Sequence, residues 1–285
     1  MNADHSPPTR LALPLSAEGY AHANEAFRQC WTADRAEVLA FMRQHLPTTS
    51  ANNLHVLGFG VGDGEFDVQI IAALRAAFPT TTINYIAVEP NTAQLQRFAE
   101  RMRTEAVQLT QHPLQAEEYT VEGEFDLIHY IHALYHMPGS EARLLRDALA
   151  GLRPGGKLLI ALSSERGGIY QLMGQFWERI DYSFFTTGLF GQESLRATLA
   201  EIGVPYTAEI YPDVAIDVGP CFDPDSDLGR HLLNFLLQAA IDQAPEDLRQ
   251  DVLDALDALA PNIDGRRLLS HPSGVFVVTP PPAGV

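Results

Sequence analysis

The feature that most constrains the fold is a short turn with four glycines at alternate positions. The apolar patterning predicts a strand over 54–57 and a helix over 65–77. The turn between them carries Gly58, Gly60, Gly62 and Gly64. Glycine lets a backbone approach a ligand closely, and the following helix presents free N–H groups to it. Because a plain strand–helix turn needs only one or two glycines, the pattern favours a ligand-binding turn.

Short apolar segments alternate with amphipathic ones along the chain. Further strands are expected at about 83–88, 107–109, 125–130, 157–162, 206–211 and 274–278. Helices are expected at about 16–46, 92–102, 140–152, 168–180, 192–202, 228–242 and 246–260. Such alternation predicts an α/β, doubly wound, mostly parallel sheet with helices on both faces.

Charge and composition limit the partners. The chain has 19 Lys and Arg against 36 Asp and Glu, a formal net charge of −17. An acidic surface repels phosphate backbones and anionic lipid, so we expect no nucleic-acid or membrane partner. Cys30 and Cys221 are too few for a disulfide framework or a cysteine-rich zinc site. With no signal peptide or long apolar run, we expect a cytoplasmic protein, monomeric or homodimeric.

The spacing of the glycines separates classes of nucleotide-like ligand. In the three registers of G-x-G-x-x-G, the third glycine is replaced by Asp63, Glu65 or Asp67, and no phosphate-binding G-x-x-x-x-G-K-[ST] occurs. These acids disfavour a polyanion and tolerate a cationic ligand. Glu89 ends the second strand, where a carboxylate accepts hydrogen bonds from ribose hydroxyls. Its simpler interpretation is a charge near a helix N-terminus. Together these features indicate an adenosyl ligand without phosphates, S-adenosylmethionine (SAM).

Longer segments extend this pattern. They are residues 57–70, 83–84, 88–94, 125–129, 221–223, 235–236, 244–245 and 247–249, with Ile131, Leu134 and Tyr135. From about residue 15 onward, the chain resembles the class I SAM-dependent methyltransferases, and more narrowly the histamine N-methyltransferase family. The resemblance implies a Rossmann-like seven-stranded sheet with helical insertions that cover the substrate.

The residues of the N-terminus, rich in proline and small polar side chains, and the resemblance together predict a domain organisation. We expect a mobile tail over 1–14 and a single methyltransferase domain over 15–285. Within that domain, residues 15–49 are expected as an N-terminal helical lid and 50–165 as the SAM-binding half. Residues 166–285 are expected as a substrate-side half with a helical insert.

The cofactor positions of the family are retained in this chain. The resemblance implies a SAM site at Gly60, Glu89, Gln94, the segment near Gln115 and the backbone around Ile131. Gly58 and Gly62 join it because they belong to the same turn. We therefore expect SAM as the cofactor.

The substrate positions differ from the family pattern. Where the family carries Glu, Gln and Asn against the substrate, this chain carries Asp34, His132 and His271. Tyr20, Tyr135 and Phe235 match aromatic pocket positions, whereas two pocket tryptophans of the family fall near Ile169 and Met173. The cofactor half is kept and the substrate half is changed, which weakens the case for histamine itself.

The residue types suggest two acceptor chemistries. A neutral imidazole nitrogen attacks a methyl group with its own lone pair and needs alignment above all. An indole C3 becomes a better nucleophile when a base holds the ring N–H, which His132 suits near neutral pH. We expect His132, Tyr20 and Asp34 to serve catalysis on a small amine, amino acid or cyclic dipeptide, with either ring, in a small-metabolite pathway.

Simpler interpretations stand beside these. Tyr20 and Trp31 are also consistent with helix packing, Asp34 with a solvated helix charge, and His132 with an ordinary buried histidine. His132 and His136 lack a third ligand at a suitable spacing, so no metal is expected.

Two other functions use a similar fold. Aminopropyl transfer from decarboxylated SAM requires paired aspartates after the fourth strand, and residues 132–136 contain none. A non-catalytic SAM-binding module would have its cofactor contacts broken, yet Gly60, Glu89 and Gln94 are intact.

Overall fold

The structure, a computed structural model, describes residues 10–31, 34–48, 52–185 and 188–280. The chain divides into two compact units, each built from three separate segments. Unit 1 takes residues from 1–33, 165–185 and 212–272, and unit 2 takes residues from 34–164, 186–211 and 273–285. Each unit is described by itself.

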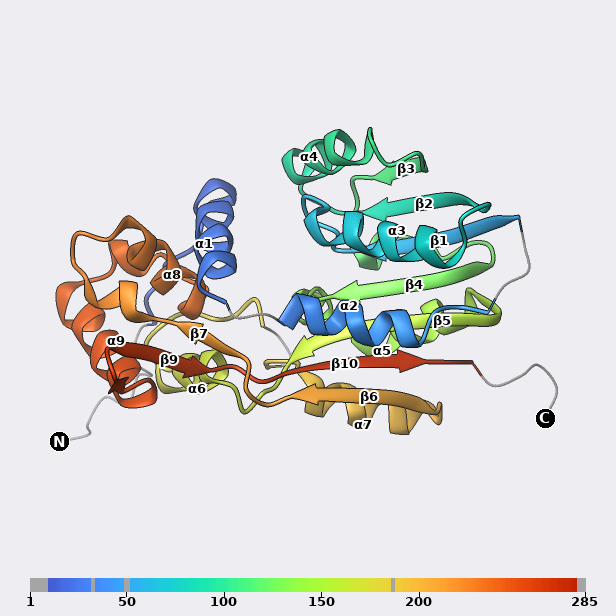
Figure 1. The fold of residues 1–285 in the computed structure, drawn as a ribbon. Coiled ribbons are helices and arrows are strands. Elements are labelled where there is room, and N and C mark those ends of the chain that lie inside the picture. Colours follow the sequence, from blue (N-terminus) through green and yellow to red (C-terminus); the bar gives the residue numbers. More distant parts are fainter. Residues whose placement is uncertain (1–9, 32–33, 49–51, 186–187, 281–285) are drawn as a thin grey trace. The chain divides into compact units, whose positions relative to one another are not determined.

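Unit 2 is built on a seven-stranded sheet (Figure 1). Its strands are β1 (Asn53–Phe59), β2 (Thr82–Val88), β3 (Gln108–His112), β4 (Phe125–Ile131), β5 (Leu152–Ser163), β6 (Tyr206–Tyr211) and β10 (Ser273–Val278). The order is β3-β2-β1-β4-β5-β10-β6, and only β10 runs antiparallel to its neighbours. The predicted mostly parallel sheet is confirmed.

Helices cover both faces of this sheet. They are α2 (Asp34–Gln44), α3 (Glu65–Ala77), α4 (Thr92–Met102), α5 (Glu141–Ala150) and α7 (Gln192–Ile202), with short 3-10 helices η1 (Ala116–Glu118) and η2 (Leu134–His136). One core joins α2, α3 and α4 to the sheet, and a second joins α5 and α7 to it. Successive strand residues serve opposite cores, as Val56 and Leu57 of β1 do, because side chains alternate along a strand. The doubly wound arrangement is therefore confirmed.

Unit 1 is mainly helical. It contains α1 (Ala17–Cys30), α6 (Gly168–Gln175), α8 (Asp227–Leu237), α9 (Glu246–Leu259), η3 (Gly219–Phe222) and η4 (Ile241–Gln243). Ser16 caps α1 by accepting a 3.0 Å hydrogen bond from the Gly19 N–H, and Ser226 caps α8 in the same way. A small sheet in the order β7-β9-β8 was not expected; its strands are β7 (Ala215–Asp217), β8 (Asn262–Ile263) and β9 (Arg266–Ser270).

The N-terminal region differs from its expected form. The helix expected over 16–46 is two helices, α1 and α2, which belong to different units, so the segment expected as one lid is divided. In the tail expected over 1–14, residues 1–9 lie outside the described part. Leu11, however, pairs with the segment at Ile180: its N–H donates to Arg179 O at 2.8 Å, and its carbonyl accepts from Asp181 N–H at 2.9 Å. These bonds tie the chain down before residue 14.

Candidate active site

The glycine turn joins the end of β1 to the start of α3 in unit 2. Gly60, Gly62 and Gly64 have φ values of 63°, 56° and 76°, in the left-handed region that favours glycine. A Cβ on Gly60 would lie 2.6 Å from the Cβ of Ala133. A Cβ on Gly62 would meet no atom within 4 Å. The turn is therefore packed from behind at Gly60 and open at Gly62.

Glu89 lies at the end of β2 and faces this turn. Its carboxylate accepts hydrogen bonds from the Gly62 N–H at 3.1 Å and the Asn91 N–H at 2.9 Å. Burial raises the pKa of Glu89; the two backbone donors oppose that shift, and the negative charge of Asp67 adds to it. The sequence placed Glu89 at a strand end, but only the fold shows that it also orders the glycine turn.

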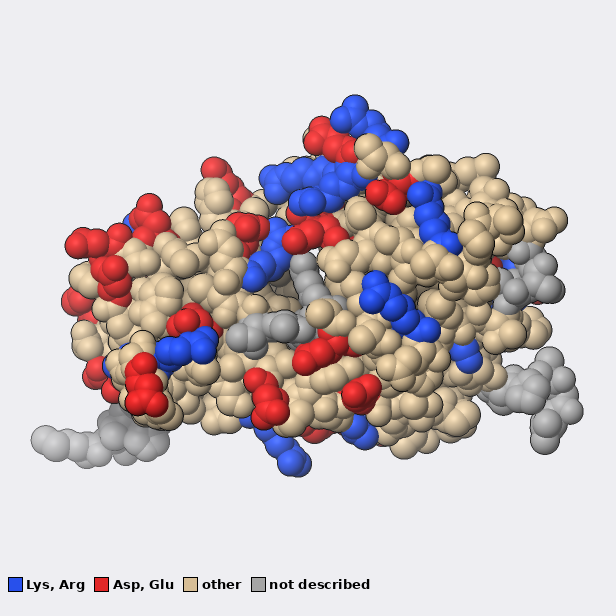
Figure 2. All heavy atoms as spheres, viewed as in Figure 1, with Lys and Arg blue, Asp and Glu red and all other residues tan. Residues whose placement is uncertain are grey.

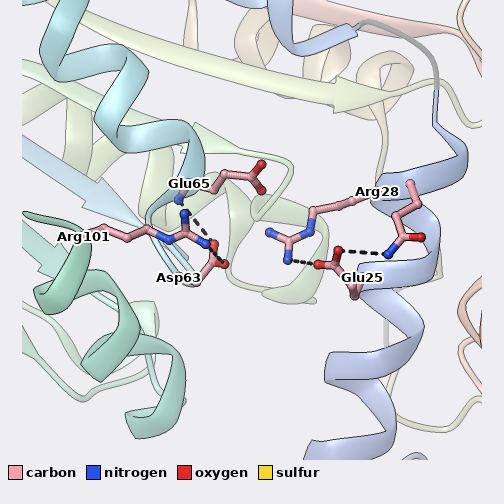
Figure 3. Close-up of polar contacts among 6 residues, drawn as sticks. Glu25, Arg28, Asp63, Glu65 and Arg101 are labelled. Atoms are coloured by element: carbon pink, nitrogen blue, oxygen red, sulfur yellow. Dashed lines mark hydrogen bonds and ion pairs between the residues drawn. The ribbon is translucent and has the colours of Figure 1, made fainter.

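The three acids of the turn do not form one exposed cluster. Asp63 is buried and accepts from Arg101 Nη2 of α4 at 2.9 Å and from the Glu65 N–H at 3.3 Å, as Figure 3 shows. Glu65 is exposed. Asp67 is 3% exposed and accepts a hydrogen bond from the Tyr85 hydroxyl. Asp67, which the sequence groups with the acids that disfavour a polyanion, is therefore hydrogen-bonded inside the unit.

Basic side chains gather near this region of unit 2. On the face shown in Figure 2, Lys and Arg spheres collect over α4, where the sequence carries Arg97, Arg101 and Arg103. Of these, Arg101 is bonded to Asp63. Part of the excess of acidic charge is therefore balanced locally beside the glycine turn.

The remaining cofactor residues of the prediction lie at the carboxyl ends of neighbouring strands. Gln94 is in the first turn of α4, which Asn91 caps, and its side-chain oxygen is buried with no hydrogen-bond partner among the described residues. Gln115 is exposed at the start of η1, and its N–H donates to Glu118 at 3.1 Å. Ile131 ends β4 and is half-buried. Parallel sheets bind ligands at this edge.

Two predicted substrate residues follow β4 in unit 2. His132 has a φ of 50°, and its N–H donates to Ala161 O of β5 at 2.9 Å. A non-glycine residue with positive φ is uncommon and is concentrated at functional sites. Tyr135 is half-buried in η2, with its ring edge-on to His136 at 4.5 Å between centroids. Asp34 begins α2, and its side chain lies outside the described part of the structure.

Three other predicted substrate residues come together in unit 1, within an aromatic cluster. Its members are Tyr20 and Phe27 of α1, Trp31 directly after that helix, Phe235 of α8 and His271 after β9. The Phe27 and Phe235 rings stack with centroids 4.1 Å apart. His271 is 3% exposed and meets Phe27 and Trp31 edge-on, at 6.2 and 6.1 Å.

Phe27 was not predicted from the sequence as a member of this cluster. The i, i+4 spacing of Phe27 and Trp31 put both rings on one side of a helix. Their partner Phe235 is far away in the sequence, so only the fold could bring the three together.

Residues 31–206, more than half of the chain, match the family of methyltransferase domains. The chain belongs to this family. Carnosine N-methyltransferase 2 from Gallus gallus is 27% identical over 264 residues, which cover 85% of this chain and 80% of that protein. Histamine N-methyltransferase from Danio rerio is 28% identical over 243 residues, covering 79% and 82%. The chain is thus a SAM-dependent methyltransferase.

Solved structures support the fold of this methyltransferase. The YcgJ protein from Bacillus subtilis has a TM-score of 0.56 at 14% identity, covering 86% of this chain and 99% of that one. The plantazolicin methyltransferase BpumL, in complex with a pentazolic desmethylPZN analog and SAH, has a TM-score of 0.50 at 11% identity, covering 93% and 92%. Within the described residues, no helix is long and apolar enough to cross a membrane, and no group of three or more potential ligands could hold a metal ion.

Proposed function

We propose that this methyltransferase moves the methyl group of SAM to a ring nitrogen of an imidazole-bearing small molecule. The observation that carries the proposal is the pair of relatives named for carnosine and histamine, which the chain matches over about four-fifths of their length. Both of these acceptors are small molecules that contain an imidazole ring.

We assign the SAM site to the glycine turn and the strand ends beside it. Three observations support this assignment: the open space at Gly62, the inward-facing Glu89 carboxylate and the buried Gln94 oxygen. Glu89 accepts hydrogen bonds and so suits ribose hydroxyls. Gly58, Gly60, Gln115 and Ile131 belong to the same edge. When bound there, SAM supplies an electrophilic methyl group.

Unit 1 supplies the aromatic surface for a flat acceptor ring. We assign acceptor binding to Tyr20, Phe235 and His271, whose rings lie in one cluster. Aromatic walls bind heteroaromatic rings by stacking and edge contacts. A neutral imidazole brings its own nucleophilic lone pair, so these residues need only orient it.

His132 is assigned to the acceptor as a group that accepts a ring N–H. Its position directly after β4 and its positive φ support a role in the site. For an indole carbon acceptor, His132 would have to act as a base, because the ring N–H proton must then be removed. Tyr135 and Asp34 remain predicted substrate contacts.

The test is transfer of labelled methyl from SAM to a panel of histamine, carnosine, histidine, tryptamine and tryptophan-containing cyclic dipeptides. Mass-spectrometric fragmentation locates the label. We expect label on the imidazole ring of at least one acceptor. Label on an indole carbon, or on a side-chain amine alone, would overturn the proposal.

The same assay tests His132. We expect His132→Ala to lower turnover by about tenfold, the cost of a lost hydrogen bond to a buried partner, with SAH affinity unchanged. Equal turnover in that variant would remove His132 from the site.

A further inference from the structure

Beneath the glycine turn, three polar side chains of unit 2 meet in the core. Tyr85 of β2, Asp67 of α3 and His129 of β4 are 0%, 3% and 2% exposed. The Tyr85 hydroxyl donates to Asp67 Oδ1 and lies 2.6 Å from His129 Nε2. His129 Nε2 is 3.3 Å from the same Asp67 oxygen. Such a cluster is costly to bury unless each group is bonded.

Gly58 creates the room for this cluster. It pairs in register with Ala87 of β2 and His129 of β4, so it stands between the two strands that supply Tyr85 and His129. A Cβ on Gly58 would lie 2.6 Å from the Tyr85 hydroxyl oxygen and 2.7 Å from His129 Nε2. The first glycine of the turn therefore serves the buried cluster, because any side chain there would displace both groups.

The protons in the cluster can be placed by counting donors. The single hydroxyl proton of Tyr85 goes to Asp67, so the Tyr85–His129 contact needs a proton on His129 Nε2. The Nδ1 atom of His129 is buried with no hydrogen-bond partner among the described residues. Burial and the Asp67 carboxylate raise the pKa of Tyr85, which keeps it protonated.

Asp67 links the cluster to the site. Asp67 lies in the first turn of α3, directly after the glycine turn, and its negative charge raises the pKa of Glu89. The partial positive charge at the N-terminus of α3 stabilises the buried carboxylate. Anchoring Asp67 to β2 and β4 thus fixes where α3 begins relative to the strands.

We propose that the Asp67–Tyr85–His129 cluster positions the cofactor turn, holding Gly58 and the start of α3 in the one arrangement that accepts SAM. These residues touch no cofactor atom; they act through the backbone from 58 to 65. The proposal rests on the assignment of the glycine turn as the SAM site.

The test is the dissociation constant of S-adenosylhomocysteine (SAH), measured by calorimetry well below the melting temperature. Tyr85→Phe removes one hydroxyl and leaves the ring. We expect SAH affinity to fall about tenfold, since Asp67 and His129 both lose a partner and the turn loosens. If Tyr85→Phe bound SAH with wild-type affinity, even with a lower melting temperature, the proposal would be overturned. The cluster would then contribute to stability alone.

Tyr130→Phe is the matched control. Tyr130 neighbours His129 on β4 but faces the opposite core, where its hydroxyl is buried with no hydrogen-bond partner among the described residues. We expect its removal to leave SAH affinity unchanged. An equal loss in both variants would show a general effect of core hydroxyls and would also overturn the proposal.

A measurement on the wild-type protein covers the case in which Tyr85→Phe fails to fold. Long-range ¹H–¹⁵N NMR reports the tautomer of His129. We expect the Nε2–H form, with a chemical shift that moves when SAH saturates the protein. A shift indifferent to SAH would overturn the proposal. Wild-type protein that binds no SAH would instead contradict the assigned SAM site.

Discussion

The two units differ in the surroundings of the residues predicted to bind ligands. In unit 2, the buried and half-buried carboxylates near the glycine turn are matched with hydrogen-bond donors: Asp63 with Arg101 and the Glu65 N–H, Asp67 with Tyr85, and Glu89 with two backbone N–H groups. In unit 1, His271 is buried among aromatic rings. Removing one member of a matched pair leaves the other unsatisfied at a cost of about 1–3 kcal/mol, whereas stacked rings accept related shapes more readily.

The difference suits the proposed assignment, in which unit 2 binds the cofactor and unit 1 contributes aromatic rings to acceptor binding. A cofactor shared by many methyltransferases needs one fixed geometry, and hydrogen-bonded pairs supply it. An acceptor site must change with the acceptor, and a cluster of rings can be altered one member at a time. On the proposed assignment, this contrast accounts for the retained family positions at the glycine turn and for the change at His271, whereas Asp34 and His132, which also differ, belong to unit 2.

Among the variants that test the contrast between the two units, Gly60→Ala should have the largest effect on SAH affinity. The new Cβ meets the Ala133 Cβ at 2.6 Å, and the residue must keep a φ of 63°. We expect SAH affinity to fall about a hundredfold, because backbone strain and displacement of the turn add together.

Gly203→Ala is the matched control for that variant. Gly203 also has a positive φ, 78°, at the end of α7, but its Cβ would meet nothing within 4 Å. We expect a loss of about 1 kcal/mol in the free energy of unfolding, with SAH binding intact. If Gly60→Ala bound SAH like Gly203→Ala, the glycine turn would not be the cofactor site.

A medium effect, confined to the acceptor, is expected for His271→Asn. The change restores the amide that the resemblance implies at this position and removes a ring from the aromatic cluster. We expect the KM for the acceptor to change about tenfold, in either direction, while the SAH dissociation constant stays within about twofold. Phe184→Ala, at a side chain of unit 1 that is 53% exposed, should change neither. A changed SAH affinity in His271→Asn would break the division between the two units.

The smallest effect is a pH dependence of SAH binding. Ribose hydroxyls need the charged form of Glu89, and burial raises its pKa above the ordinary 4.5. Affinity should therefore be full above that raised pKa and fall as the pH drops through it. Asp67, whose charge faces Glu89, contributes to the shift. Glu89→Gln should bind SAH more weakly and lose this pH dependence; a variant that keeps it would assign the effect to another group.

Much of unit 2 could be predicted from the sequence because its signals are local. The glycine turn, the strand over 54–57 and the helix over 65–77 follow from apolar spacing and glycine positions alone, and the structure has β1 and α3 there. The ends of parallel strands then bring Glu89 and Ile131 to one edge. The buried position of Asp67 could not be predicted, because helix spacing alone does not say which face of α3 meets the sheet.

Unit 1 was harder to predict because its order depends on contacts between distant segments. Strands β7 and β8, with three and two residues, are too short to show the alternation that identifies a strand, and the five residues of β9 do not alternate between apolar and polar. The break between α1 and α2 falls inside a continuous helical spacing, so the sequence merged them. The Phe27–Phe235 stack and the placement of His271 beside Trp31 required the fold itself.

The strand order also affects how the protein is made. β10 lies between β5 and β6 and bonds to both, yet 61 residues of unit 1 (212–272) separate it from β6. At about 5–20 residues per second, a ribosome needs roughly 3–13 s to travel from the end of β6 to the end of β10. During that interval β5 and β6 have unpaired edges, which attract other strands. The nascent methyltransferase is therefore exposed to association through these strand edges until β10 has been made.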